Sequence, residues 1–272
     1  MKKPILLSII CCFVWIAQAQ HSELQTLINQ KRYQEVIKQA TGMNKSDSSD
    51  IQTLYIVGQA YEGMLKYKEA YQCYKYCLSL DTTRIDLLNT MARTAAYIGK
   101  AREAELYFHK VLKQDSTDFY ANYQLARLYM QAGQHAEAMD RFHYLLEQDP
   151  GNPVLLRNMG DCHNRTDNLL HASTYYTKAF LNNKENAVLA STLVNTLLLI
   201  QDPETALTIC DTALIYNPDN RVLLQSKAIV LFTLKKYTQS DELYTTLIAE
   251  GDSSYKTIKF GAISRYYAGK YM

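Results

Sequence analysis

The sequence repeats itself every 34 residues, and this period restricts the fold more than any other feature of the chain. Units that start at residues 17, 51, 85, 119, 153, 187, 221 and 255 carry the same kinds of side chain at fixed positions, with no insertion or deletion. A period of roughly 20 to 50 residues is typical of proteins built from stacked supersecondary units. The repeat therefore predicts one array in which each unit contacts mainly its neighbours and a continuous core runs through the units.

Small side chains recur at two positions of the unit, and a large ring recurs at a third. The eighth position carries Gly58, Ala92, Ala126, Gly160, Val194, Ala228 and Ala262. The twentieth carries Val36, Ala70, Ala104, Ala138, Ala172, Ala206 and Ser240. The twenty-fourth carries Tyr74, Phe108, Phe142, Tyr176 and Tyr244, with Ala40 and Cys210 as exceptions. Because interiors are close-packed, we expect the ring to fill the space beside two closely approaching helices.

Each unit is predicted to contain two helices. In the second unit the apolar residues Leu54, Val57 and Tyr61 follow helical spacing, and Ala70 and Tyr74 resume it after a turn. The chain has only 10 glycines and 5 prolines, too few for the closely spaced turns of a β-sandwich or barrel. The fold class predicted from the pattern is therefore all-α.

Glycine marks the turn between the two helices in three units, at Gly99, Gly133 and Gly269. A glycine there is typical of a helix that ends in the left-handed backbone conformation. Asp167 replaces this glycine in unit five, and Pro203 lies in the turn of unit six, so those two turns lack the glycine signal.

The pattern resembles the tetratricopeptide repeat (TPR) family, most closely in the unit that starts at Phe119. Its residues on the family's characteristic positions are Leu125, Ala126, Tyr129, Gly133, Ala138, Phe142 and Pro150. The resemblance covers about residue 21 to the end, and it implies a right-handed superhelical solenoid of helix-turn-helix units. The array would occupy residues 20–272 as one domain with an incomplete last unit. The family's common tryptophan is absent, and proline ends a unit only at Pro150 and Pro218.

The amino terminus is predicted to be a secretory signal peptide, residues 1–19. Lys2 and Lys3 precede an apolar run from Ile5 to Ile16, and Ala17-Gln18-Ala19 is a small-residue cleavage site. The apolar run is shorter than the roughly 20 residues that span a bilayer, which favours cleavage over anchoring. The sequence thus predicts export, to the periplasm or the cell surface of a bacterial envelope.

Removal of this segment leaves a chain without net charge. Lys and Arg fall from 29 to 27 with the loss of Lys2 and Lys3, against 27 Asp and Glu. Binding to the phosphates of nucleic acid depends on clustered positive charge, so no nucleic-acid partner is predicted.

Four cysteines follow the predicted signal peptide: Cys73, Cys77, Cys162 and Cys210. Cys73 and Cys77 lie four residues apart on a helical pattern, a geometry that suits a disulfide poorly. We expect these side chains to be small and buried rather than bonded. Cys162 and His163 point about 100° apart on a helix, so the sequence predicts no metal site there.

The sequence contains no catalytic motif and predicts no enzyme, no cofactor and no small-molecule substrate. The phosphate-binding loop, the zinc-protease helix motif and the serine-hydrolase elbow are all missing. The histidines are scattered at positions 21, 109, 135, 143, 163 and 171.

The resemblance implies that the first helix of each unit lines a concave groove in which a protein or peptide partner binds. Positions two, five, nine and twelve of the unit share one helical face. The candidate groove residues are Asn89, Arg93, Tyr120, Tyr123, Arg127, Arg157, Asp161 and Asn164 in a polar stretch and Leu198, Ile229 and Phe232 in an apolar one.

The residue types of the polar stretch suit peptide recognition. Arginine can grip a carboxylate with two hydrogen bonds, asparagine can pair with a peptide backbone, and tyrosine offers rigid contact area. The alternative is a solvated helix face that carries intramolecular pairs, such as Arg157 with Asp161.

The function predicted from these features is a non-catalytic scaffold or adaptor of the cell envelope. An alternative is the extracytoplasmic sensory region of a longer transmembrane signalling protein, and a third is the binding part of an enzyme whose catalytic domain follows Met272. The chain stops three residues after Gly269, where the pattern predicts a further helix. This favours a fragment of a longer protein. A missing downstream segment could then associate with a membrane.

Overall fold

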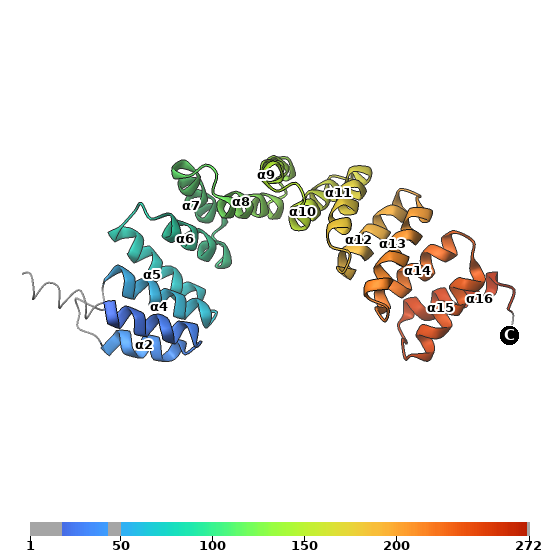
Figure 1. Cartoon of the computed structure of the whole chain (residues 1–272), viewed down its shortest axis with the longest axis horizontal. Helices are drawn as coiled ribbons and strands as arrows, with labels where there is room; N and C mark the ends of the chain where they lie inside the picture. The colour runs from blue at the N-terminus through green and yellow to red at the C-terminus, as the bar shows by residue number, and fades with distance from the viewer. Residues whose placement is uncertain (1–17, 43–49, 271–272) are drawn as a thin grey trace, which may run out of the picture. The chain divides into compact units, whose positions relative to one another are not determined.

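The computed structural model describes residues 18–42 and 50–270, and every regular element within those residues is a helix (Figure 1). Residues 18–29 are helical. The helices that follow are α2 (Tyr33–Gly42), α4 (Ile51–Gly63), α5 (Tyr67–Leu80), α6 (Ile85–Tyr97), α7 (Ala101–Gln114), α8 (Phe119–Gln131), α9 (His135–Gln148), α10 (Pro153–Arg165), α11 (Leu169–Asn182), α12 (Ala187–Leu199), α13 (Pro203–Tyr216), α14 (Arg221–Thr233), α15 (Tyr237–Ala249) and α16 (Tyr255–Tyr267). The all-α prediction is confirmed.

The repeat register is confirmed by where the helices begin. The first helices of seven consecutive units, α4, α6, α8, α10, α12, α14 and α16, start at residues 51, 85, 119, 153, 187, 221 and 255. These are the predicted first positions of the units. Each 34-residue period of the sequence therefore corresponds to one helix-turn-helix unit.

The chain divides into two compact units, one that runs to Leu128 and one that starts at Tyr129, with the boundary inside α8. In the first, α2 packs on α4, α4 on α5, α5 on α6 and α6 on α7. In the second, each helix from α9 to α16 packs on the next, and the first helices α12 and α14 also touch. Each compact unit is thus a stack of helix pairs, a TPR-type solenoid.

The turn inside every repeat has the same backbone conformation, whether or not it contains glycine. Positive φ angles recur at Lys31, Leu65, Gly99, Gly133, Asp167, Gln201, Lys235 and Gly269, again 34 residues apart. In each turn the next residue's N–H bonds to a carbonyl five residues back, as Lys66 does to Tyr61 at 2.8 Å and Asp202 to Leu197 at 2.9 Å. These bonds satisfy the last carbonyls of the helix. Units five and six therefore turn like the others, and Pro203 starts α13.

Side-chain oxygens cap several first helices. Asn152, Asn186 and Asn220, one period apart, accept hydrogen bonds from the first backbone N–H groups of α10, α12 and α14. Asp50 does the same for α4, and Ser254 for α16. Capping supplies acceptors for donors that the helix itself leaves unpaired.

The core between the helices is built from the small residues and rings of the repeat. Tyr74, Phe108, Phe142, Tyr176 and Tyr244 are all at most 1% exposed. The small residues of the twentieth position are completely buried in every unit from Val36 to Ser240. The packing role that the pattern predicts for these positions is confirmed.

The cysteines of the described residues are free thiols, as expected. Cys77, Cys162 and Cys210 are buried, and Cys73 is half-buried. Burial raises the pKa of the thiols to about 11 in Cys73, Cys77 and Cys162 and to about 12 in Cys210. A thiol with such a pKa is a poor nucleophile at neutral pH.

The predicted signal peptide lies almost entirely in residues 1–17, outside the described residues. Among the helices that are described, none combines the length and apolar character that a bilayer crossing requires.

Candidate functional site

The face formed by the first helices carries a polar cluster in the first compact unit, and Glu62 of α4 lies at its centre. The carboxylate of Glu62 accepts hydrogen bonds from Tyr74 Oη at 3.0 Å, Arg93 Nη2 at 2.7 Å and Thr94 Oγ1 at 3.0 Å. The Glu62 side chain is only 14% exposed. Three donors converging on one shielded carboxylate fix the relative positions of α4, α5 and α6.

The predicted groove residue Arg93 is thus partly engaged inside the protein. Burial alone would lower the pKa of Arg93, but the nearby Glu62 carboxylate and the Tyr120 phenol raise it, so the net shift is upward. Tyr120 packs edge-on against Phe108, with 6.2 Å between ring centres. Arg93 remains 40% exposed, so a permanently charged guanidinium is held in place with part of its surface open.

Three polar atoms of this face are buried and have no hydrogen-bond partner in the described structure: Gln59 Oε1, Asn89 Oδ1 and Arg93 Nε. Asn89 is oriented by its own amide nitrogen, which donates to Asp118 Oδ2 at 3.3 Å. Buried polar groups are normally paired, and leaving one unpaired costs about 1 to 3 kcal/mol. Two acceptors and one donor of this face therefore lack a partner among the described residues.

Arg127 and Tyr123 form a more open part of the same helix face, on α8. The guanidinium carbon of Arg127 lies 5.9 Å from the centre of the Tyr123 ring, and Tyr123 stacks on Phe119. Arg127 is exposed, and its Nη1 donates to Gln124 Oε1 at a long 3.4 Å. Contacts within the protein therefore hold the charged Arg127 side chain only weakly in place.

The candidate residues of α10 belong to the second compact unit. Asp161 accepts a hydrogen bond from Tyr176 Oη at 2.7 Å, and Arg157 Nε lies 3.9 Å from the other Asp161 oxygen. Burial, followed by the hydrogen bond to Asp161, raises the pKa of Tyr176. Asn164 is exposed. The pair within one helix, which the solvated-face alternative predicts, is present here, and Asp161 mainly holds a core tyrosine.

The three apolar candidates lie half-buried rather than on an open strip. Leu198 packs against the main core of the second compact unit, and Ile229 packs against the cluster around Tyr244. Phe232 contacts Tyr237 and Tyr267 edge-on, at 5.2 and 5.7 Å between ring centres. These side chains stabilise neighbouring helices and leave only part of their surface for a partner.

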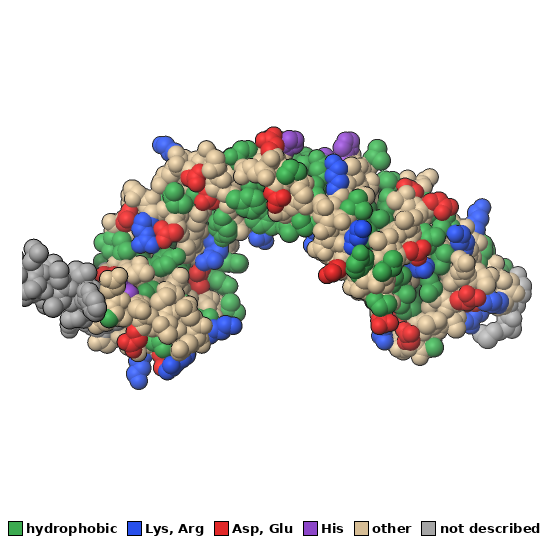
Figure 2. Space-filling view, in the orientation of Figure 1, with side chains coloured by type: hydrophobic (Ala, Val, Ile, Leu, Met, Phe, Trp, Pro, Cys, Tyr) green, Lys and Arg blue, Asp and Glu red, His purple; other side chains and the backbone are tan. Residues whose placement is uncertain are grey.

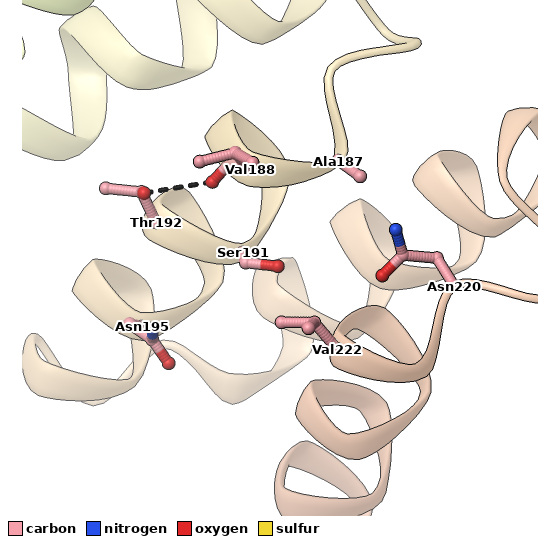
Figure 3. Close-up of a pocket in the computed structure, with 7 residues that line it drawn as sticks. All are labelled: Ala187, Val188, Ser191, Thr192, Asn195, Asn220 and Val222. Atoms are coloured by element: carbon pink, nitrogen blue, oxygen red, sulfur yellow. Dashed lines mark hydrogen bonds between the residues drawn. The ribbon is translucent and has the colours of Figure 1, made fainter.

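A pocket of about 210 Å³ opens between α12 and α14, and it is not lined by the apolar candidates Leu198, Ile229 and Phe232. It is lined by Ala187, Val188, Ser191, Thr192, Asn195, Asn220 and Val222. Ser191 and Val222 point toward one another across the gap between the two helices (Figure 3). The signal that could have revealed it is the small side chain of Ser191 at the fifth position, where other units carry larger residues.

The surface of the described residues outside these sites carries charged side chains of both signs. On the face shown in Figure 2, basic and acidic side chains are scattered over each compact unit. No group of three potential metal ligands occurs among residues 18–42 and 50–270. The described side chains can interact with a partner through hydrogen bonds, ion pairs and apolar contacts.

The comparisons with known proteins agree with the fold. Two family models, each described as tetratricopeptide repeat, match residues 51–84 and 95–153. Tetratricopeptide repeats are therefore present in those parts of the chain. None of the curated proteins compared with the chain matches it.

Solved structures extend the likeness to most of the chain. The C-terminal part of a TPR repeat-containing protein from Cytophaga hutchinsonii matches with a TM-score of 0.75 and 12% identity, covering 88% of this chain and 98% of that one. A tetratricopeptide repeat protein from Parabacteroides merdae matches with 0.60 and 14%, covering 81% and 87%. MamA from Desulfovibrio magneticus RS-1 matches with 0.58 and 17%, covering 63% and 97%. At these identities the likeness shows the fold.

Proposed function

We propose that this protein is a non-catalytic scaffold of the cell envelope that holds a protein or peptide partner on the face of its first helices. The observation that carries the proposal is the set of unpartnered buried atoms on α4 and α6: Gln59 Oε1, Asn89 Oδ1 and Arg93 Nε. A peptide backbone offers both N–H and C=O groups, so it can supply the partners that these atoms lack. TPR folds typically serve as scaffolds for protein interaction, which supports the same reading.

Charge favours a partner with an acidic group near α8. Arg127 is exposed, and its guanidinium contacts the Tyr123 ring and makes one long hydrogen bond to Gln124. Arginine binds carboxylates with strong, charge-assisted hydrogen bonds. Arg93 contributes less to this attraction because Glu62 already neutralises it at 2.7 Å.

Export is the second part of the proposal. It rests on Lys2 and Lys3, the apolar run from Ile5 to Ile16 and the Ala17-Gln18-Ala19 site. The mass of the native protein in separated cell fractions tests it. A species running from Gln20 to Met272 outside the cytoplasm supports export, and a cytoplasmic species that retains Met1 contradicts it.

Photocrosslinking in the native cell tests partner binding. Benzoylphenylalanine replaces Tyr120 on the first-helix face, and in a control it replaces Tyr76, which is 51% exposed on the second helix α5. We expect a discrete cross-linked partner from position 120 only, and its loss when Arg127→Glu is added. Equal cross-linking from both positions, or none from position 120, would overturn the proposal.

A further inference from the structure

The pocket between α12 and α14 exists because one side chain of the repeat is unusually small there. The fifth position carries Ser191 in this unit and His21, Tyr55, Asn89, Tyr123, Arg157, Gln225 and Lys259 in the others. In the next unit the larger Gln225 of α14 donates to Asp252, in the turn before α16, and to Thr257 in α16. Ser191 cannot reach its neighbour in this way, so the space between α12 and α14 stays open.

The walls of this pocket are mainly apolar, and its rim is exposed. Val188 is 65% exposed and Val222 is 57% exposed, on opposite sides of the opening. Covering such side chains removes apolar surface from water, which favours an apolar ligand at about 25 cal/mol per Å². An apolar cavity of about 150 Å³ is large enough to hold benzene, so 210 Å³ accommodates one branched aliphatic side chain.

One polar group inside the pocket lacks a partner. Ser191 is 8% exposed, and its Oγ is buried without a hydrogen bond in the described structure. Thr192, by contrast, satisfies its hydroxyl on the Val188 carbonyl at 2.9 Å, as the dashed line in Figure 3 marks. A hydroxyl can donate or accept, so Ser191 can bond to a backbone amide group that arrives beside an inserted side chain.

Charge defines the ligand further. The whole of α12, from Ala187 to Leu199, contains no charged residue, and no charged side chain lines the pocket. A charged group placed here would lose its hydration without gaining a counter-charge. The pocket therefore matches an uncharged segment and excludes one with an acidic or basic residue at the point of insertion.

We propose that this pocket is an anchor site for an uncharged peptide segment of a partner, which inserts one Val, Leu or Ile side chain between α12 and α14 and bonds to Ser191 through its backbone. This inference rests on the proposed function, because it names the chemistry of a partner that binds first helices of the repeat. It also requires an uncharged segment with an aliphatic side chain in the partner, in addition to the acidic group expected near Arg127.

Selection from a random peptide display library against the full chain tests the proposal. We expect the selected peptides to share an aliphatic residue within a stretch free of charges. A synthetic consensus peptide should lose affinity by about tenfold when this residue is replaced by Asp. Ser191→Gln, which fills the pocket with the side chain found in the next unit, and Val222→Ser, which removes one apolar rim, should weaken binding to a similar degree.

Thr208→Gln is the matched control, because Thr208 is exposed on the second helix α13 of the same repeat. This variant should bind like the wild type. Val222→Ser changes an exposed side chain and should not affect folding. It therefore still tests the pocket if Ser191→Gln lowers the melting temperature.

The outcomes separate the two proposals. Peptides that bind without an aliphatic anchor, or that bind the Ser191→Gln and Val222→Ser variants as tightly as the wild type, would overturn the pocket and leave the scaffold function standing. Failure to select any peptide would overturn peptide binding and the pocket with it. Self-association of the chain that Ser191→Gln abolishes, without peptide binding, would show that a second copy occupies the pocket and would also overturn the proposal.

Discussion

Gly160 of α10 lies directly against the ring of Tyr176 of α11, so closely that a Cβ atom at Gly160 would come within 2.5 Å of Tyr176 Cε1. Gly58 has the same relationship to Tyr74. Both tyrosines are held by a carboxylate, Tyr176 by Asp161 at 2.7 Å and Tyr74 by Glu62 at 3.0 Å. The ring therefore cannot move away easily, and glycine is required beside it.

Gly160→Ala is expected to destabilise the protein by about 1 to 3 kcal/mol, because it overpacks this contact. In a Tyr176→Phe background the cost should be smaller, since the ring is no longer tied to Asp161 and can shift. Unfolding by urea measures both. Gly42→Ala is the control, because a Cβ at Gly42 meets nothing within 4 Å. An equal cost in both backgrounds would contradict the role of the hydrogen bond.

Gln201→Gly is expected to stabilise the turn between α12 and α13 by about 1 kcal/mol. Gln201 has a φ of 62°, a conformation that strains side chains other than glycine. The reciprocal change, Gly99→Ala at φ 80°, should destabilise the protein by a similar amount. Thermal or urea unfolding gives both values. A loss of stability in Gln201→Gly would mean that the extra freedom of the unfolded chain outweighs the relief of strain.

Glu62→Gln is expected to cost about 1 to 3 kcal/mol of stability, because the charged hydrogen bonds from Tyr74, Arg93 and Thr94 all end on this carboxylate. The matched control is Glu35→Gln, which removes an exposed ion pair with Arg32 and should change little. Similar effects for the two variants in urea unfolding would show that the Glu62 network is not a structural centre.

Stability should decline as the pH falls below about 6.5, in part because of His163. Its ring stacks with the rings of His171 and Tyr175, each at 5.3 Å between ring centres. Burial, followed by the charge of His171, lowers the pKa of His163 from its usual 6.5. The unfolded chain therefore takes up this proton at a higher pH than the folded one does. Stability from this group is complete above 6.5 and is lost as the pH falls through the folded pKa.

The variant His163→Phe tests this assignment, because it keeps an aromatic ring in the stack and removes the titrating group. Its free energy of unfolding should depend less on pH between 7 and 5 than that of the wild type. His143→Gln, at an exposed position, should keep the wild-type dependence. A wild-type pH dependence in His163→Phe would exclude His163 as the source.

Local and periodic features of the fold could be read from the sequence. The 34-residue period placed the starts of seven first helices, and the small residues and rings marked the core. Ala262 is the exception: its counterparts at the eighth position are buried, but Ala262 is exposed. The eighth-position residue normally packs against the ring on the second helix of its own unit, as Gly160 does against Tyr176. Within the described residues, no second helix follows α16 to cover Ala262.

Turn conformation was only partly predictable. Glycine revealed the left-handed residue at Gly99, Gly133 and Gly269, but Leu65 and Lys235 adopt the same conformation without any glycine signal. Helix packing on both sides imposes the turn, and the repeat period is a better guide to it than residue type.

Partners within the site could not be predicted, because they depend on residues about one repeat apart. Nothing in the local sequence shows that Arg93 bonds to Glu62, 31 residues earlier, or that the space beside Ser191 stays unfilled. Residue type and helix face identify candidates for binding. Whether a candidate is already engaged follows only from the packing of neighbouring units.

The most direct test of peptide binding on the first helices is a comparison of backbone amide NMR spectra of the full chain with and without a selected peptide. We predict shift changes on the first helices of the compact unit that the peptide binds: around Asn89 and Arg127 on α6 and α8 in the first unit, or around Ser191 on α12 and α14 in the second. The exposed faces of the second helices α5, α7, α11 and α13 should be unchanged. Shift changes confined to those second helices would contradict the account.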